Sequence, residues 1–498
     1  MNNRLLPQLV RDAAISHSEK IAVLGRDESI TYSQLDEYAD RIGTRLVSLG
    51  VRKGDRVLLW AKKSGRLVAA MQAVLRLGAV YVPIDPMAPM EQVEKVISDC
   101  EPVAVICDKA LEDKLELGNL DLNADWDELL LGPRYSLGSQ NLKSSEVAYI
   151  LYTSGTTGIP KGVAITHENA FAFVSWAEQL TGAKAQDVFA NHAPFHFDLS
   201  VFDLYVAFSV GASVVLIPGE MAFAPELLLE RIRECEVSIW YSVPSAIILM
   251  MEQGRMLEYD DLALRMVIFA GEPFPVSKFW PLHDRWPELR YLNFYGPTET
   301  NVCTFYEVTA EETCRDAPLP IGKACSSNHT FIIDDEGKQI EDEREGELIV
   351  QGCSVMQGYW GGEPTNGRFA TGDVVRYDSE LNLVFLGRRD GMLKIRGNRI
   401  EAGEIESVLL EMPEISEAVV TVCGQGIYQK LIAFLVTGAS SPPSLLGIKR
   451  FCAARLVPYK IVQRIYFVEE MPRTHTGKID RRALRDRAES FEEGRIGT

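Results

Sequence analysis

The first four-fifths of this chain alternates helix-like segments with short apolar runs, and this alternation limits the folds that it can adopt. Residues 89–100 (PMEQVEKVISDC) have the pattern of a helix, and a strand-like run at 102–108 (PVAVICD) follows directly. Helix, strand, helix and strand are expected again between residues 225 and 271. Such alternation is typical of α/β proteins with mainly parallel sheets. The sequence therefore predicts an α/β architecture here.

Two later regions have a different pattern. Residues 330–340 and 346–353 have the alternation of short strands joined by a turn, which predicts a small β subdomain. After residue 390, a hairpin, a helix, two strands and another helix are expected, in a unit of normal domain size. We therefore expect a large N-terminal domain over residues 1–389, and a small, mobile α+β domain over residues 390–498.

Composition narrows the class of protein. A chain of 498 residues with 46% hydrophobic content can bury large cores. The N-terminus lacks the apolar core of a signal peptide, and the most apolar window, residues 202–218, is short for a bilayer span. We therefore expect a soluble cytoplasmic protein. The nine cysteines, between Cys100 and Cys452, include no Cys-x-x-Cys pair, which argues against a disulfide framework or a structural zinc site.

The net charge of −19 disfavours nucleic acid or an anionic membrane as the main partner. The charge is uneven along the chain. Residues 391–498 carry 16 basic and 13 acidic side chains, whereas the remainder carries 35 and 57. This difference is either chance surface variation or the sign of a separate C-terminal domain that meets acidic partners.

The segment YILYTSGTTGIPKG, from Tyr149 to Gly162, is rich in glycine and hydroxyl side chains. Its spacing is not that of a Walker P-loop. Glycines still let backbone N–H groups converge on an anion, hydroxyls add donors, and Lys161 adds a positive charge. The alternative is a flexible linker. Flanking strand-like runs and Pro160 favour a phosphate-binding loop.

The chain as a whole resembles the adenylate-forming enzymes, which include the amino-acid adenylation domains of nonribosomal peptide synthesis, acyl-CoA synthetases and luciferases. The resemblance covers essentially the full length, and ten motifs occur in the order of that family. These motifs are ITYSQL, LRLGAVYVPIDP, YTSGTTGIPKG, FDLSVFDLY, NFYGPTET, GELIVQGCSVMQGYW, TGDVVRY, GRRDGMLKIRGNRIEAGEIE, LVPYK and PRTHTGKIDRRAL.

The resemblance implies ATP and Mg²⁺ as cofactors. Glu299 would bind Mg²⁺, which prefers carboxylate oxygen, although a helix-start acid is its ordinary interpretation. Asp373 would accept hydrogen bonds from the ribose hydroxyls, with Arg388 assisting. A turn residue is the ordinary interpretation of Asp373. The residues implied in ATP binding are Thr153, Ser154, Gly155, Thr156, Thr157, Gly158, Lys161, Gly271, Asn293, Tyr295, Gly296, Thr298, Asp373 and Arg388.

Lys478 is the implied catalytic residue, because an ammonium can stabilise charge that develops on the phosphoryl and carboxylate oxygens. A solvated lysine is the ordinary alternative. Thr474, His475 and Thr476 depart from the family pattern, with an expected effect on loop conformation only. Asp390 matches the hinge at which the small domain of this family rotates between two half-reactions, and a simple exposed turn is its alternative.

Asp198 indicates which acid is activated. It matches the aspartate with which amino-acid adenylation domains bind the substrate α-ammonium. A buried carboxylate at this position would be costly without such a cation. The alternative is a helix N-cap. Asp203 is expected to be a structural or surface residue.

The matching pocket positions are mostly apolar and bulky, which predicts a small cavity, although some of these residues are expected to pack as core. They are Asp198, Leu199, Phe202, Tyr241, Ile268, Ala270, Phe294, Val302 and Cys303. This combination resembles the free-standing L-prolyl adenylating enzymes of pyrrole biosynthesis. D-alanine:carrier ligases have a similar layout, and related small side chains stay possible, because pockets discriminate by only about 1–3 kcal/mol per methylene.

The sequence ends twenty residues after Lys478 and shows no phosphopantetheine attachment segment, so we expect the acceptor to act in trans. An acidic carrier protein bearing a phosphopantetheine thiol is the expected partner, and coenzyme A is its rival. A non-catalytic nucleotide-binding or scaffold protein would be expected to lose Lys478, Glu299 or Asp373, and all three are present.

Overall fold

The computed structural model describes residues 4–26, 28–107, 118–122, 125–137, 142–153, 160–309, 316–389, 393–424, 428–438, 442–473 and 479–492. The chain divides into two compact units. The first comprises Met1–Pro86, Asp99–Tyr152 and Gly162–Arg389, and the second comprises Met87–Ser98, Thr153–Lys161 and Asp390–Thr498. The long part of the second unit begins at the residue where the sequence patterns change, but its two short segments were not expected from the sequence.

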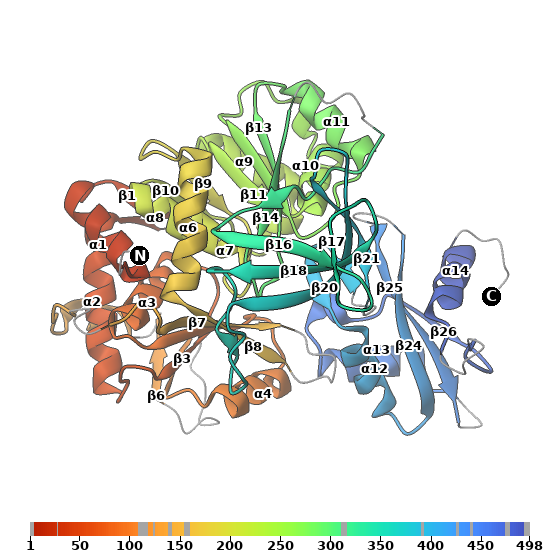
Figure 1. Cartoon of the computed structure of the whole chain (residues 1–498). Helices are drawn as coiled ribbons and strands as arrows, with labels where there is room; N and C mark the ends of the chain where they lie inside the picture. The colour runs from red at the N-terminus through yellow and green to blue at the C-terminus, as the bar shows by residue number, and fades with distance from the viewer. Residues whose placement is uncertain are drawn as a thin grey trace. The chain divides into compact units, whose positions relative to one another are not determined.

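The first unit contains a nine-stranded sheet in the order β15-β14-β13-β12-β11-β9-β10-β1-β2 (Figure 1). The strands from β13 to β1 in this order are parallel, and β2, β14 and β15 are antiparallel strands at the edges. Their bounds are β1 Ile21–Leu24, β2 Ser29–Thr31, β9 Val188–Asn191, β10 Ser213–Leu216, β11 Ile239–Ser242, β12 Met266–Ala270, β13 Arg290–Tyr295, β14 Thr304–Val308 and β15 Lys323–Ala324.

A seven-stranded sheet has the order β19-β8-β7-β4-β3-β5-β6, and a five-stranded antiparallel sheet has the order β17-β16-β18-β20-β21. The strands of the seven-stranded sheet are β3 Arg56–Trp60, β4 Val80–Pro83, β5 Ala104–Cys107, β6 Gly118–Asp121, β7 Val147–Thr153, β8 Lys161–Thr166 and β19 Gly358–Tyr359. Those of the five-stranded sheet are β16 Asn328–Ile333, β17 Gln339–Ile340, β18 Gly346–Gly352, β20 Arg368–Tyr377 and β21 Leu383–Arg388.

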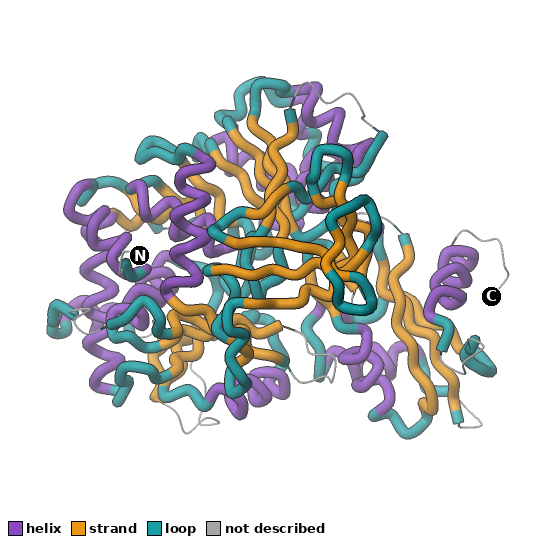
Figure 2. Tube along the Cα trace, viewed as in Figure 1, coloured by secondary structure: helices purple, strands orange, loops and turns teal. Residues whose placement is uncertain are grey.

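Helices alternate with these strands along the chain, as Figure 2 shows. They are α1 Leu6–Ser16, α2 Tyr32–Ser48, α3 Gly65–Arg76, α4 Met90–Cys100, α5 Trp126–Leu131, α6 His167–Thr181, α7 Leu199–Val201, α8 Ala207–Val210, α9 Pro225–Glu234, α10 Pro244–Glu252 and α11 Val276–Arg285, with a π-helix at Phe202–Val206 and 3-10 turns at Met221–Phe223 and Met256–Glu258.

Local sequence explains where the longer helices begin and end. Thr31 caps α2 by accepting from the backbone N–H of Gln34, whose side chain accepts in return from the Thr31 N–H. Thr166 and Asn169 form the same reciprocal cap at α6. Such capping boxes satisfy N–H groups that a helix start otherwise leaves unpaired. Gly182 ends α6 in the left-handed conformation, with φ of 56°.

The second unit has the mixed α+β content expected from the sequence. Its strands are β22 Leu393–Ile395, β23 Asn398–Ile400, β24 Ile415–Cys423, β25 Lys430–Thr437 and β26 Arg464–Phe467, and its helices are α12 Ala402–Leu410, α13 Leu445–Ala453 and α14 Arg481–Glu492, with a 3-10 turn at Pro458–Lys460. β22 and β23 form the predicted hairpin. β24 and β25 pair antiparallel, and β26 joins β25 in parallel.

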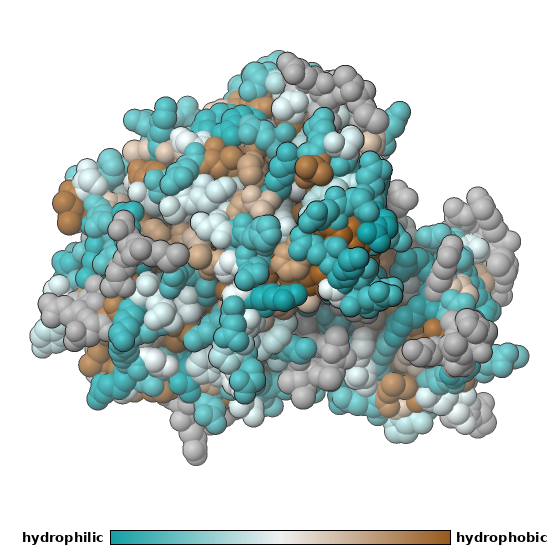
Figure 3. Space-filling view, viewed as in Figure 1, coloured by the Kyte–Doolittle hydropathy of each residue, from teal (hydrophilic) through white to brown (hydrophobic). Residues whose placement is uncertain are grey.

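Separate hydrophobic cores hold the two units. A large cluster fills the first unit, and another, around Ile405 and Leu435, lies between the helices and sheet of the second. The face drawn in Figure 3 is mainly hydrophilic, with separate apolar patches. None of the helices in the described part of the chain combines the length and hydrophobicity that a bilayer crossing requires.

Candidate active site

Asp373 is held from two sides in the first unit. It lies on β20 opposite Arg388 on β21, and only 1% of it is exposed. Arg388 Nη1 donates to Asp373 Oδ1 at 2.8 Å, and the Tyr295 hydroxyl donates to Oδ2. Burial, with a further contribution from Asp373, raises the pKa of Tyr295, so its hydroxyl stays a donor. The carboxylate therefore has one fixed orientation, which suits the recognition of a pair of hydroxyl groups.

A tight turn follows β13, directly after Tyr295. At Gly296, a Cβ would lie 1.6 Å from the backbone oxygen of Asn301, so only glycine allows this close approach. Asn293 lies on β13 two residues before Tyr295, and its Nδ2 donates to the Pro320 carbonyl at 2.7 Å. One amide donor of Asn293 is therefore used inside the protein, and its contact with ATP stays a prediction.

Two further positions predicted for the nucleotide lie at the ends of these elements. Gly271 follows β12 with φ of 86°, a left-handed conformation that favours glycine. Thr298 is half-buried in the turn, where its carbonyl accepts from the Asn301 N–H at 3.4 Å. Both residues belong to the first unit, and their contact with ATP stays a prediction.

Glu299 is fully buried and accepts a hydrogen bond from the Tyr359 hydroxyl at 2.7 Å. Tyr359 lies on β19, which pairs with β8 at Val163. Carboxylate oxygen is the ligand that Mg²⁺ prefers, and the binding of Mg²⁺ by Glu299 stays a prediction. Among the residues that the structure describes, no three His, Cys, Asp or Glu side chains cluster as a metal site, so a cation here would take its other ligands from water or phosphate.

Several predicted residues are only partly covered by the structure. Thr153 ends β7 and Lys161 begins β8, and the Thr153 hydroxyl donates to the Lys161 carbonyl at 3.5 Å. Residues 154–158 of the predicted phosphate loop, Asp390 and Lys478 lie outside the described residues. Their roles therefore stay predictions.

Asp198 stands at the start of α7 and is half-buried. Asp198 occupies the N-cap position of α7, but its side chain makes no capping hydrogen bond to this helix, and its role in binding the substrate ammonium stays a prediction. After burial, the charge of Asp198 is the leading cause that raises the pKa of Tyr241, and it also contributes at Tyr149. The carboxylate therefore lies close to two buried phenol rings.

Predicted pocket residues come together at the carboxyl ends of neighbouring parallel strands. Tyr241 on β11 pairs with Ile268 on β12, and Ala270 pairs with Phe294 on β13. The Phe202 ring, from the π-helix, contacts Tyr241 and Phe294 edge-on at 5.2 and 6.1 Å between centroids, and Tyr241 contacts Phe294 at 5.7 Å. All of these residues and Val302 belong to one hydrophobic cluster, against which Leu199 packs. Ligands of α/β sheets commonly bind at such strand ends.

Cys303 packs in a different hydrophobic cluster from the other predicted pocket residues, and its contact with a substrate stays a prediction. Its side chain belongs to the cluster around Tyr295 and Ile321, whereas Cys325 belongs to the cluster of the aromatic pocket. Cys325 also contributes to the raised pKa of Tyr241. Val302 stands in a bend before β14, and Val302 and Cys303 belong to different hydrophobic clusters. The packing of Cys325 with the aromatic residues of the pocket was not predictable from the sequence.

Trp176 on α6 is a further residue that the sequence analysis missed. Its ring lies 5.3 Å from Phe294 and 5.2 Å from Phe305 between centroids. No motif includes it, because its contact with β13 arises only from the packing of the helix on the sheet.

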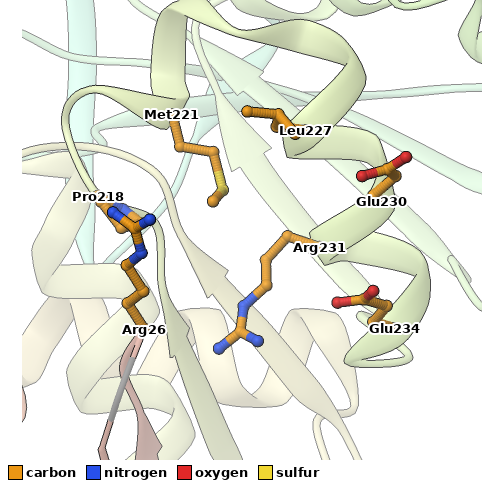
Figure 4. A pocket seen from close by; sticks show the side chains of 7 residues that line it. All are labelled: Arg26, Pro218, Met221, Leu227, Glu230, Arg231 and Glu234. Atoms are coloured by element: carbon orange, nitrogen blue, oxygen red, sulfur yellow. The ribbon is translucent and has the colours of Figure 1, made fainter.

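A separate pocket of about 180 Å³ lies between the 218–221 turn and α9 (Figure 4). It contains none of the predicted site residues. Arg231 in its wall donates to the Gly25 carbonyl at 2.6 Å, and Arg26 pairs with Glu220 at 3.5 Å. These contacts connect neighbouring chain segments and give the pocket no catalytic group.

A buried carboxylate held by Arg388 and Tyr295, together with a second acid beside an aromatic pocket, is compatible with an enzyme that joins a nucleotide to a small substrate. The fold belongs to the same class, that of the adenylate-forming enzymes. A solved structure of a double mutant of o-succinylbenzoate CoA synthetase from Bacillus subtilis, bound with a product analogue, superposes with a TM-score of 0.86 at 25% identity, covering 96% of this chain and 98% of that one. The chain belongs to the AMP-binding enzyme family: residues 10–360 match AMP-binding enzyme, and residues 404–478 match AMP-binding enzyme C-terminal domain.

Relatives of similar length align with nearly the whole chain. An L-proline--[L-prolyl-carrier protein] ligase from Pseudomonas fluorescens is 43% identical over 494 residues, covering 97% of this chain and 99% of that protein. A protein of the same name from Streptomyces coelicolor is 36% identical over 512 residues, covering 96% and 95%. These comparisons confirm the family that the ordered sequence motifs indicate.

Proposed function

We propose that this enzyme activates L-proline with ATP and transfers it to the phosphopantetheine thiol of a carrier protein. The observation that carries the proposal is the half-buried Asp198 beside the compact aromatic pocket of Phe202, Tyr241 and Phe294. A secondary ammonium can donate to the carboxylate while the proline ring packs against these rings. The names and high identity of the two carrier-protein ligases support the same substrate.

In the first half-reaction, a carboxylate oxygen of proline attacks the α-phosphorus of ATP, an oxygen–phosphorus bond forms, and pyrophosphate leaves. Asp198 holds the substrate ammonium, and Asp373 with Arg388 holds the ribose hydroxyls. Lys478 places its ammonium between the reacting oxygens, where it offsets their developing charge. When bound, Mg²⁺ neutralises phosphate charge beside Glu299.

In the second half-reaction, the carrier thiol loses its proton to solvent, its sulfur attacks the acyl carbon, and AMP leaves. We assign residues 1–389 to the core domain and residues 390–498 to the mobile domain, with Asp390 as the pivot between the half-reactions. A slightly basic C-terminal segment suits an acidic carrier that acts in trans. We place the enzyme in the cytoplasm, where ATP is available.

The test is amino-acid-dependent ATP–pyrophosphate exchange with L-proline, D- and L-alanine, other aliphatic amino acids and a fatty acid. We expect the fastest exchange with L-proline and none in Lys478→Ala. Lys449→Ala is the matched control, because Lys449 is an exposed lysine of the same domain. Fastest exchange with D-alanine would overturn the substrate but keep the chemistry. Exchange with the fatty acid alone would overturn the role of Asp198.

Transfer is tested separately, with labelled aminoacyl-AMP formed on the enzyme. We expect label on a holo-carrier protein and none on its apo form, which lacks the thiol. Faster transfer to coenzyme A than to the carrier would make the enzyme an acyl-CoA ligase.

A further inference from the structure

Lys63 lies against the chain segment that leads to Asp198. Its Nζ donates to three consecutive carbonyls, those of Asn191 at 2.9 Å, His192 at 3.1 Å and Ala193 at 2.9 Å. The same ammonium lies 5.7 Å from the centroid of the Phe195 ring. One charged group therefore fixes the path of the backbone from the end of β9 toward Asp198.

Asp203 fixes the far end of this segment. It is 1% exposed on the π-helix, and its Oδ2 accepts from Asn191 Nδ2 at 3.1 Å. The sequence-based expectation of a structural residue is thus confirmed, and that of a surface residue is wrong. Burial lowers the pKa of Lys63 to about 7 and raises the pKa of Asp203, and the charge of each group opposes the shift of the other. The two residues thereby join both ends of the segment through Asn191.

This segment carries the functional groups of the amino-acid pocket. Asp198 lies between the carbonyls held by Lys63 and the π-helix that holds Asp203, and Phe202 of that helix forms the pocket wall with Tyr241. Because ligand geometry depends on sub-ångström placement of such groups, a fixed segment keeps the carboxylate and the ring at one separation. Lys63 itself touches neither the pocket rings nor the ATP-site residues described above.

We propose that Lys63 is a positioning residue of the amino-acid site: its ammonium, opposite Asp203, sets the path of residues 191–203 and thereby the place of Asp198 in the pocket. The inference rests on the proposed amino-acid activation and adds a residue from outside the pocket to it. This role differs from that of a merely structural lysine. Loss of a structural lysine would lower stability, and it would not affect the KM for L-proline more than the KM for ATP.

The test compares Lys63→Met, which keeps the length of the side chain and removes its charge, with Lys62→Met at the neighbouring exposed position. In exchange assays we expect Lys63→Met to raise the KM for L-proline by about tenfold or more and to leave the KM for ATP within about twofold. Lys62→Met is expected to match the wild type. Equal increases in both KM values, or no change in either, would overturn the proposal.

Binding supplies a readout that is independent of turnover. Titration calorimetry gives the affinity for a prolyl sulfamoyl-adenosine, and for a sulfamoyl-adenosine without the amino acid. The ratio of the two affinities reports the amino-acid site alone. We expect Lys63→Met to lower this ratio by about tenfold, and an unchanged ratio would overturn the proposal.

Asp203→Asn is the second variant and is used if Lys63→Met does not fold. Its amide oxygen can still accept from Asn191 Nδ2, so only the carboxyl group that faces Lys63 is replaced. The same fall in the affinity ratio is expected, and an unchanged ratio would again overturn the proposal. If the wild type exchanges fastest with another amino acid, the proposed substrate fails by itself, and the Lys63 comparison is made with that amino acid and its sulfamoyl-adenosine conjugate.

Discussion

Arg388 and Asp373 face each other across β21 and β20, with Arg388 Nη1 2.8 Å from Asp373 Oδ1. The guanidinium is 9% exposed and the carboxylate 1%. A charge so far from water is costly without its partner, so the two side chains act as one unit. The Tyr295 hydroxyl on the other carboxylate oxygen completes it.

Arg388→Met should lower the free energy of unfolding by about 3 kcal/mol, because it leaves the Asp373 carboxylate buried and unpaired. It should also raise the KM for ATP by about tenfold or more, since the carboxylate loses its fixed orientation. Urea unfolding and the ATP dependence of exchange measure the two effects.

Arg389→Met is the matched control for this change. Arg389 is 37% exposed and pairs with Asp335, which is 92% exposed, and at 3.4 Å with Glu347, so its loss should cost about 1 kcal/mol. Equal losses of stability in the two variants would contradict the special place of Arg388.

Asp198→Asn should lower kcat/KM for L-proline by about a hundredfold or more, because a neutral amide replaces the carboxylate that offsets the substrate ammonium. Stability should change little, since asparagine keeps the size of the half-buried side chain. Exchange at varied proline and circular dichroism during heating check the two expectations. A parallel fall of activity and melting temperature would instead indicate a structural role.

Sequence patterns predicted the elements well where the signal is local. The helix at 89–100 appears as α4, the strand at 102–108 as β5, and the hairpin after residue 392 as β22 and β23. Alternation of apolar and polar residues over a short window determines such elements. The family motifs named Tyr241, Ile268 and Phe294 as pocket positions, and the structure places these residues on three neighbouring parallel strands.

Residues that reach the site from other segments were not predictable in this way. Tyr359 contacts Glu299 across 60 positions of sequence, and Lys63 contacts Asn191 across 128. Neither lies within a local pattern that signals these contacts, which exist only once the sheets and helices have packed. Trp176 and Cys325 were missed for the same physical reason.

The two cysteines near the pocket give a matched pair of variants. Cys325→Ala should widen the aromatic pocket, so that larger aliphatic amino acids gain about tenfold in kcat/KM relative to L-proline. Cys303→Ala should cost about 1–2 kcal/mol of stability through the cluster around Tyr295 and leave this preference unchanged. Exchange with a graded set of aliphatic amino acids measures the preference. A larger change of preference in Cys303→Ala would restore the original assignment of the pocket.

His167 makes the first unit sensitive to acid. It is 1% exposed at the start of α6, and its Nδ1 accepts from the Leu6 N–H at 3.4 Å. Burial lowers the pKa of His167 from 6.5 to about 4, against a smaller opposite effect of Glu146. Between these two pH values the unfolded chain binds a proton that the folded protein excludes. The free energy of unfolding therefore rises with pH across this window and falls as the pH drops through it.

His167→Gln removes the imidazole that binds this proton and keeps a side-chain oxygen that can accept from the Leu6 N–H. We expect the wild type to lose about 3 kcal/mol more stability than the variant between pH 7 and pH 4, from the size of the pKa shift. Urea unfolding at a series of pH values measures the difference. Carboxylates and the buried His192 titrate in both proteins, so they cancel in the comparison. Parallel stability curves for the two proteins would show that His167 takes up its proton without unfolding the chain.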